Sequence, residues 1–162
     1  MKKNHNELFV KMALDAWNLQ INRCTKFFDA LSDEQLTQEV SPDRNSGVYL
    51  LGHLVAVHDG MFPLLGFGEK SYPELENIFI KNPDKSGLEK PSIQSLRQAW
   101  SNANEKLASH FDKMTSAQWF EKHTAVSEED FAKEPHRNKL NVLLNRTNHL
   151  SSHMGQLIFL KK

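Results

Sequence analysis

Apolar residues recur along this chain at intervals of three and four positions, which is the spacing of one face of an α-helix. No segment shows the strict alternation of apolar and polar residues that predicts a half-buried β-strand. The sequence therefore predicts an all-α protein. We expect four long helices, at residues 6–31, 47–67, 92–113 and 138–159.

Two short helices are predicted from capping boxes, in which a Ser or Thr is followed three residues later by Gln. The pairs are Ser32 with Gln35, which opens residues 33–39, and Thr115 with Gln118. Segments 28–36 and 111–119 are also similar to each other, and each precedes a long helix that carries histidines. This similarity indicates either an internal repeat or two ordinary capped helix junctions.

The segment 68–91 is predicted to be a long crossover loop between the second and third long helices. It contains Pro73, Pro83, Gly87 and Pro91, and Gly66 and Gly68 are expected to end the helix before it. One short helical turn is expected near residues 74–79. The segment 123–137 is polar and is interpreted as the connection to the last helix.

Length and charge narrow the function classes. A chain of 162 residues has the size of one ordinary domain, so we expect a single domain over residues 1–162. Lysine plus arginine (20) equals aspartate plus glutamate (20), and a chain without net charge lacks the basic patch typical of nucleic-acid binding. We therefore expect no nucleic-acid partner.

The N-terminal segment and the cysteine content bear on the compartment. Glu7, Lys11 and Asp15 interrupt the apolar run that a signal peptide would need. No uninterrupted apolar run approaches the roughly 18 residues of a membrane span. The single cysteine, Cys24, cannot form an internal disulfide and lies on the apolar stripe of the first helix, where we expect it to be buried. These features predict a cytoplasmic protein without a membrane segment.

Two histidines near the C-terminus are the first candidates for chemistry. His149 and His153 are four residues apart in the last predicted helix, so their side chains leave the helix only about 40° apart and could bind one metal ion. A pair at this spacing also arises by chance among eight histidines, and packed or solvated side chains are the more common explanation of such a pair. The metal hypothesis therefore needs a third ligand.

If the internal repeat is real, the third ligand should come from the second long helix. His53 and His58 are the candidates there, and five residues turn them about 140° apart, so they cannot easily share one ion. His53 has two small residues on its stripe, whereas His58 is flanked by bulkier leucines and Phe62. The spacing favours His53 modestly and leaves His58 open.

Two segments together carry a family resemblance. They are Gly-Val-Tyr-Leu-Leu-Gly-His-Leu at 47–54 and Asn-His-Leu-Ser-Ser-His-Met-Gly-Gln at 148–156. With both present, nearly the whole chain resembles the DinB/YfiT-like superfamily of metalloenzymes. The resemblance implies a four-helix bundle with up-down-down-up connectivity and a divalent metal bound by His53, His149 and His153, and it decides against His58. The family name does not imply DNA binding.

Three neutral imidazoles leave a divalent ion with an open coordination position, which is typical of catalytic sites. Zinc, nickel and iron(II) all accept such ligands. The ion can lower the pKa of a bound water to about 7 or bind a thiol as thiolate. Gln156 is expected to hydrogen-bond a ligand of the metal or to form a buried amide contact, and Tyr49 to place its hydroxyl near the site or to pack.

The resembled family includes transferases and isomerases that depend on small thiols such as bacillithiol or mycothiol, with a metal-bound thiolate attacking an electrophile. The leading hypothesis is therefore a metal-dependent thiol S-transferase, with a small-molecule thiol and an electrophile as partners. The alternatives are a metal-hydroxide hydrolase of a small amide or ester, a stress-related protein that binds a small ligand without chemistry, and a plain bundle with packed histidines.

A homodimer is also expected. The resembled family often forms homodimers, and Leu51, Val55 and Phe62 make the second long helix apolar opposite His53. A helix that is apolar on nearly all sides is either deeply buried or shared between chains.

Overall fold

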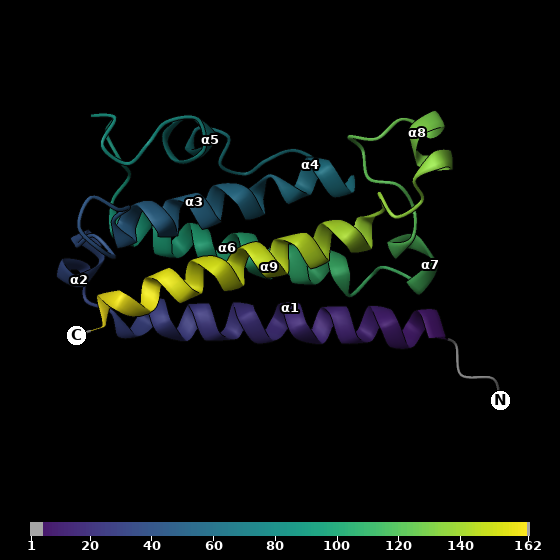
Figure 1. The fold of residues 1–162 in the computed structure, drawn as a ribbon, viewed down its shortest axis with the longest axis horizontal. Coiled ribbons are helices and arrows are strands. Elements are labelled where there is room, and N and C mark those ends of the chain that lie inside the picture. Colours follow the sequence, from purple (N-terminus) through teal and green to yellow (C-terminus); the bar gives the residue numbers. More distant parts are fainter. Residues whose placement is uncertain (1–4, 162) are drawn as a thin grey trace.

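The computed structural model describes residues 5–161, and within that range all regular structure is helical. Figure 1 shows the long helices side by side along the longest axis. These are α1 (His5–Ala30), α3 (Gly47–Asp59), α6 (Ile93–Phe111) and α9 (Lys139–Leu157), the last followed by the short 3-10 helix η1 (Ile158–Leu160). α1 packs on α9, and α3 packs on α6. The all-α prediction is confirmed.

Both predicted capping boxes are present. They open α2 (Asp33–Thr37) and α7 (Ser116–Trp119), and in each the Ser or Thr side chain and the Gln side chain bond each other's backbone N–H groups. After each short helix an isolated antiparallel bridge, Glu39 with Ser46 or Lys122 with Asn138, leads directly into a long helix. The same local motif therefore occurs in both halves of the chain, which supports the internal repeat.

The helix predicted over residues 47–67 is interrupted. α3 ends at Asp59, Gly60 forms the junction, and α4 (Met61–Leu65) follows. Pro63 has no N–H to donate to the carbonyl of Asp59 four residues earlier, so the helical ladder breaks there. Gly66 ends α4 in the left-handed conformation with φ 78°, as predicted.

The polar segment 123–137 contains a helix that the sequence analysis missed. α8 (Glu128–Lys133) begins after Ser127, whose side chain accepts a hydrogen bond from the backbone N–H of Asp130. Acidic residues fill its first turn, where they favourably meet the positive end of the helix dipole. The helix has no buried residue, so apolar periodicity could not reveal it.

The apolar face of α1 is narrower than the sequence suggests. Val10, Ala13 and Trp17 are buried, whereas Phe9 and Met12 are exposed. Each exposed residue precedes a buried one by a single position, which turns it about 100° away from the buried face. Phe9 and Met12 therefore lie on the exposed side of α1 although they are apolar.

The crossover after α4 is held against the bundle. Its one helix, α5 (Leu75–Phe79), matches the short turn predicted near residues 74–79 and packs on α3 through the fully buried Phe79. The buried carboxylate of Asp59 accepts backbone N–H groups from Ser71 and Tyr72, both at 2.8 Å. A side chain at the end of α3 thus fixes where the crossover starts.

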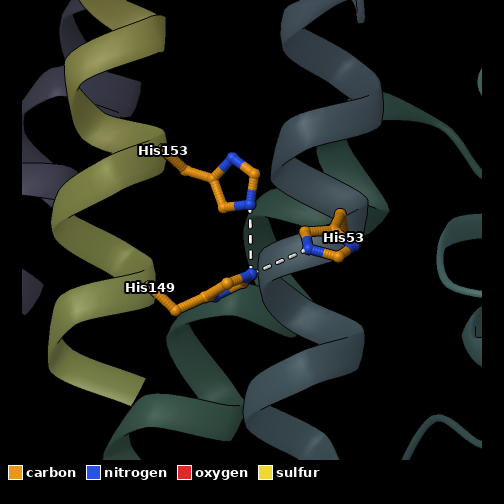
Figure 2. Close-up of side chains that lie close together, drawn as sticks. All are labelled: His53, His149 and His153. Carbon is orange, nitrogen blue, oxygen red and sulfur yellow. Dashed lines mark hydrogen bonds between the residues drawn. The ribbon is translucent and has the colours of Figure 1, made fainter. Parts of the chain in front are cut away.

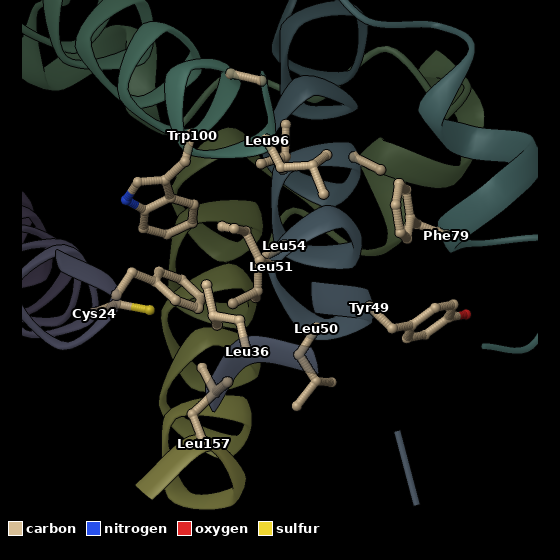
Figure 3. Close-up of a cluster of buried hydrophobic side chains, with 14 of the residues drawn as sticks. Cys24, Leu36, Tyr49, Leu50, Leu51, Leu54, Phe79, Leu96, Trp100 and Leu157 are labelled. Atoms are coloured by element: carbon tan, nitrogen blue, oxygen red, sulfur yellow. The ribbon is translucent and has the colours of Figure 1, made fainter. Parts of the chain in front are cut away.

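Figure 3 shows a cluster of buried side chains that joins α3 to its neighbours and includes Cys24, which is buried as predicted. Burial raises the pKa of the Cys24 thiol to about 12. Leu51, Val55 and Phe62 are fully buried by this chain alone. Burial within one chain therefore explains why the second long helix is apolar on nearly all sides. The apolar residues opposite His53 no longer support a homodimer, which stays a prediction.

The segment Gly47–Leu65 is long and apolar enough to cross a membrane when only length and composition are considered. Of its most apolar window, 67% is buried inside the protein. A mostly buried segment of this kind is typical of a core helix.

Candidate metal centre

Three histidines from two helices meet in the half-buried space between α3 and α9 (Figure 2). The Nε2 atom of His149 lies 3.1 Å from Nε2 of His53 and 3.1 Å from Nε2 of His153. The nitrogens that the three rings can offer all lie within 4.8 Å of one another. The structure thus brings together the three residues that the sequence analysis named.

The spacing of these nitrogens suits one metal ion. A zinc–nitrogen bond is about 2.0–2.1 Å long, so two ligands of a tetrahedral ion lie roughly 3.3 Å apart. The two separations of 3.1 Å are close to that value. No carboxylate or thiolate joins the group among residues 5–161, so an ion held here would keep its full positive charge.

Hydrogen bonds fix the tautomers of two of the rings. The Nδ1 of His53 lies 2.8 Å from the carbonyl oxygen of Phe79, which can only accept, so Nδ1 carries the proton. The Nδ1 of His153 lies 2.8 Å from Oε1 of Gln156 and donates to it. In both rings the unprotonated Nε2 faces the centre of the cluster, which is the form that binds metals.

His149 has the fewest hydrogen-bond partners within the protein of the three histidines. Its Nδ1 is buried without a hydrogen-bond partner. Burial lowers the pKa of His149 to about 4, and the neighbouring histidines and Arg146 act in the same direction. The ring therefore stays neutral at physiological pH, as a metal ligand must.

The electrostatic surroundings keep His53 neutral as well. Burial lowers its pKa most, the bond to the Phe79 carbonyl opposes this, and His153 and Arg146 lower it further. Every charged neighbour that acts on the pKa of His53 or His149 is a potential cation. These surroundings therefore disfavour protonation of the two rings and favour an anionic ligand nearby.

His58, the other candidate in the second helix, lies outside this cluster. It is fully buried, with its ring 4.9 Å from that of Trp17 and 5.1 Å from that of Trp100, centre to centre. Asn104 donates through Nδ2 to the carbonyl of Trp100 and accepts from Nδ1 of His58 at 2.8 Å. The Nε2 of His58 is buried without a hydrogen-bond partner. His58 is thus a core residue that packs between two tryptophans.

The two predicted supporting residues approach the cluster differently. Gln156 is exposed and bonds Nδ1 of His153, so it orients a histidine and forms no buried amide contact. Tyr49 stacks its ring on that of His53, with ring planes 10° apart, while its hydroxyl donates to the carbonyl of Asn82 at 2.7 Å. Tyr49 therefore contacts the site by packing.

Sequence reasoning missed the carbonyl of Phe79, which orients His53 from 26 residues away. A backbone acceptor in a crossover leaves no signal in the sequence. It also missed Arg146, three residues before His149. The i, i+3 spacing on the same helix was a signal that could have found it.

Gly52 is the residue through which α3 and α5 approach closely beside the site. A Cβ there would overlap the buried ring of Phe79. We expect Gly52→Ala to destabilise the fold by about 1–3 kcal/mol and to weaken metal binding, because Phe79 would shift and its carbonyl holds His53. Urea unfolding and metal titration measure the two effects.

Gly155→Ala in α9 is the matched control, since a Cβ there meets nothing within 4 Å. An alanine in a helix favours folding over glycine, so this variant should be as stable as the parent or more so. Equal stability of Gly52→Ala and Gly155→Ala would show that the close approach at Gly52 has no energetic consequence.

Comparison with known proteins gives one family match. The family model of the DinB superfamily matches residues 16–157, a range that includes all three clustered histidines. No curated protein matches the chain.

Proposed function

Because this chain belongs to the DinB superfamily, we propose that it holds a divalent metal ion through Nε2 of His53, His149 and His153. The observation that carries the proposal is the convergence of the three nitrogens, two of which have their protons fixed on the opposite side of the ring. Zinc, nickel and iron(II) all suit three imidazoles.

We further propose that the protein is a thiol S-transferase. When bound, the ion supplies a Lewis acid that lowers the pKa of a thiol and so generates a nucleophile at neutral pH. The chain's own thiol does not serve, because Cys24 is buried and its pKa is about 12. The nucleophile must therefore be a small-molecule thiol from solution.

A hollow whose wall includes Gln156, the residue that bonds His153, supports a small-molecule substrate. It has a volume of about 490 Å³ and is bordered by Gln156, whose side chain also bonds His153. Asp43, Arg44 and Phe159 contribute an anion, a cation and an apolar surface to its walls. Pockets of this volume typically take small ligands.

The proposed transfer has a simple balance. The thiol gives its proton to solvent, its sulfur forms a bond to the electrophilic carbon, and the leaving group departs with the bonding pair. Gln156 and the Phe79 carbonyl keep His153 and His53 in their metal-binding tautomers throughout.

The test is an assay with a panel of thiols, including bacillithiol, mycothiol and cysteine, and 1-chloro-2,4-dinitrobenzene as the electrophile. We expect thioether formation that requires both the loaded metal and a thiol. Ester or amide turnover without a thiol would instead establish the hydrolase alternative. Ligand binding without product for any pair would establish the small-ligand-binding alternative.

We also propose the up-down-down-up helix order of the superfamily. The support is the course of the ribbon in Figure 1, where α1 and α9 end, and α3 and α6 begin, at one end of the molecule. The long crossover through α5 makes the two middle helices parallel.

A further inference from the structure

Arg146 lies on the same face of α9 as two of the clustered histidines. It precedes His149 by three residues and His153 by seven, so its side chain leaves the helix about 60° from the first and about 20° from the second. His149 follows within one helical turn. The guanidinium is therefore carried on the stripe of α9 that faces the candidate metal centre.

The donors of Arg146 are unused by the protein. Its Nε is buried without a hydrogen-bond partner, and no hydrogen bond or ion pair joins the guanidinium to any residue from 5 to 161. Arg97, by contrast, has a structural role, because its Nη atoms donate to the carbonyls of Phe28 and Leu31. Packing alone therefore does not account for the charge of Arg146.

Among residues 5–161, no carboxylate pairs with Arg146. Arg146 is close enough to lower the pKa of both His53 and His149, and no carboxylate acts on either histidine. A half-buried positive charge without a partner is energetically costly, and an anionic ligand would offset that cost.

We infer that Arg146 binds the carboxylate of a small molecule whose reacting end lies at the three histidines. The planar guanidinium matches a carboxylate with two parallel hydrogen bonds, which gives both affinity and orientation. This inference rests on the proposed metal-dependent function. The carboxylate belongs either to the thiol or to its electrophilic partner, and these two sources can be separated by experiment.

The experiment is isothermal titration calorimetry on the full chain, both metal-loaded and metal-free. Three probes are used: 3-mercaptopropionate has a thiol and a carboxylate, 2-mercaptoethanol has only the thiol, and succinate has only carboxylates. The variants are Arg146→Gln, Arg146→Lys, which keeps the charge and the long stem, and the control Arg137→Gln, which removes an arginine that pairs with Glu134 before the start of α9. The metal content of every variant is measured first.

We expect Arg146→Gln to lower the affinity for a carboxylate probe about tenfold, which corresponds to the loss of one charge-assisted hydrogen-bond pair. The affinity for 2-mercaptoethanol should stay nearly unchanged. Arg146→Lys should fall between the parent and Arg146→Gln, and Arg137→Gln should match the parent. If Arg146→Gln weakens binding of 3-mercaptopropionate alone, the carboxylate that Arg146 binds belongs to the thiol substrate. If it also weakens binding of succinate, that carboxylate belongs to the electrophilic substrate.

The inference is overturned if the parent binds neither carboxylate probe, if Arg146→Gln binds both as tightly as the parent, or if Arg137→Gln loses as much affinity. Failure of the proposed function has a different signature. In that case the metal-loaded parent does not bind 2-mercaptoethanol, while the succinate titrations still report on Arg146.

Discussion

Replacing His149 with alanine is expected to lower the affinity of the protein for divalent metal by about a hundredfold or more. Loss of a residue that merely orients a ligand costs about 10–100-fold, and His149 is proposed as a ligand itself. Its Nε2 also lies 3.1 Å from both other Nε2 atoms, so its loss leaves two histidines without the nitrogen between them. Competition with a chelating indicator at neutral pH, on protein without a histidine tag, measures the affinity.

Two further variants serve as comparisons for His149→Ala. Gln156→Leu removes only the acceptor that orients His153 and should cost about tenfold. His58→Gln should bind metal as the parent does, because His58 lies in the core away from the cluster. Metal affinity of His149→Ala within a few-fold of the parent, or loss of binding in His58→Gln, would remove the proposed ligand set.

Acid is expected to destabilise the metal-free fold through His58. Its pKa is lowered from 6.5 to about 3, mainly by burial, against the Asn104 bond, which raises it. Between these values the unfolded chain binds a proton that the folded chain does not, so stability falls as the pH drops below about 6.5. Each pH unit costs about 1.4 kcal/mol, which amounts to roughly 3 kcal/mol between pH 6.5 and pH 4.

Urea unfolding of the metal-free parent and of His58→Gln at a series of pH values tests this expectation. Glutamine can still donate to Asn104 but does not titrate, so its stability should fall less steeply below pH 6.5. The lowered pKa of His149 acts in the same direction and remains in both proteins. Parallel stability curves for the two proteins would show that protonation of His58 does not oppose folding.

Features that depend on neighbouring residues could be predicted from the sequence. The two capping boxes and the helix stop at Gly66 are local hydrogen-bond and backbone preferences, and both occur where expected. The break after Asp59 could also have been predicted, because Pro63 follows it by four residues and has no N–H to donate to its carbonyl. The acidic first turn after Ser127 signalled α8, although that helix lacks the apolar stripe on which the helix prediction depended.

The candidate site was predictable only in part. Helical spacing places His149 and His153 on one face, but in α3 it favoured His53 over His58 only modestly, and the family resemblance was needed to decide between them. The packing that separates the two is long-range. His58 is enclosed by Trp17 and Trp100 from two other helices, whereas His53 meets a carbonyl from the crossover.

The central claim is that three histidines from α3 and α9 hold one metal ion. Anomalous diffraction from crystals of the zinc-loaded protein, recorded on both sides of the zinc absorption edge, tests it most directly. The account predicts one strong peak at about 2.0–2.1 Å from Nε2 of each of His53, His149 and His153. A peak elsewhere, or none between these rings in protein that carries bound zinc, would contradict it.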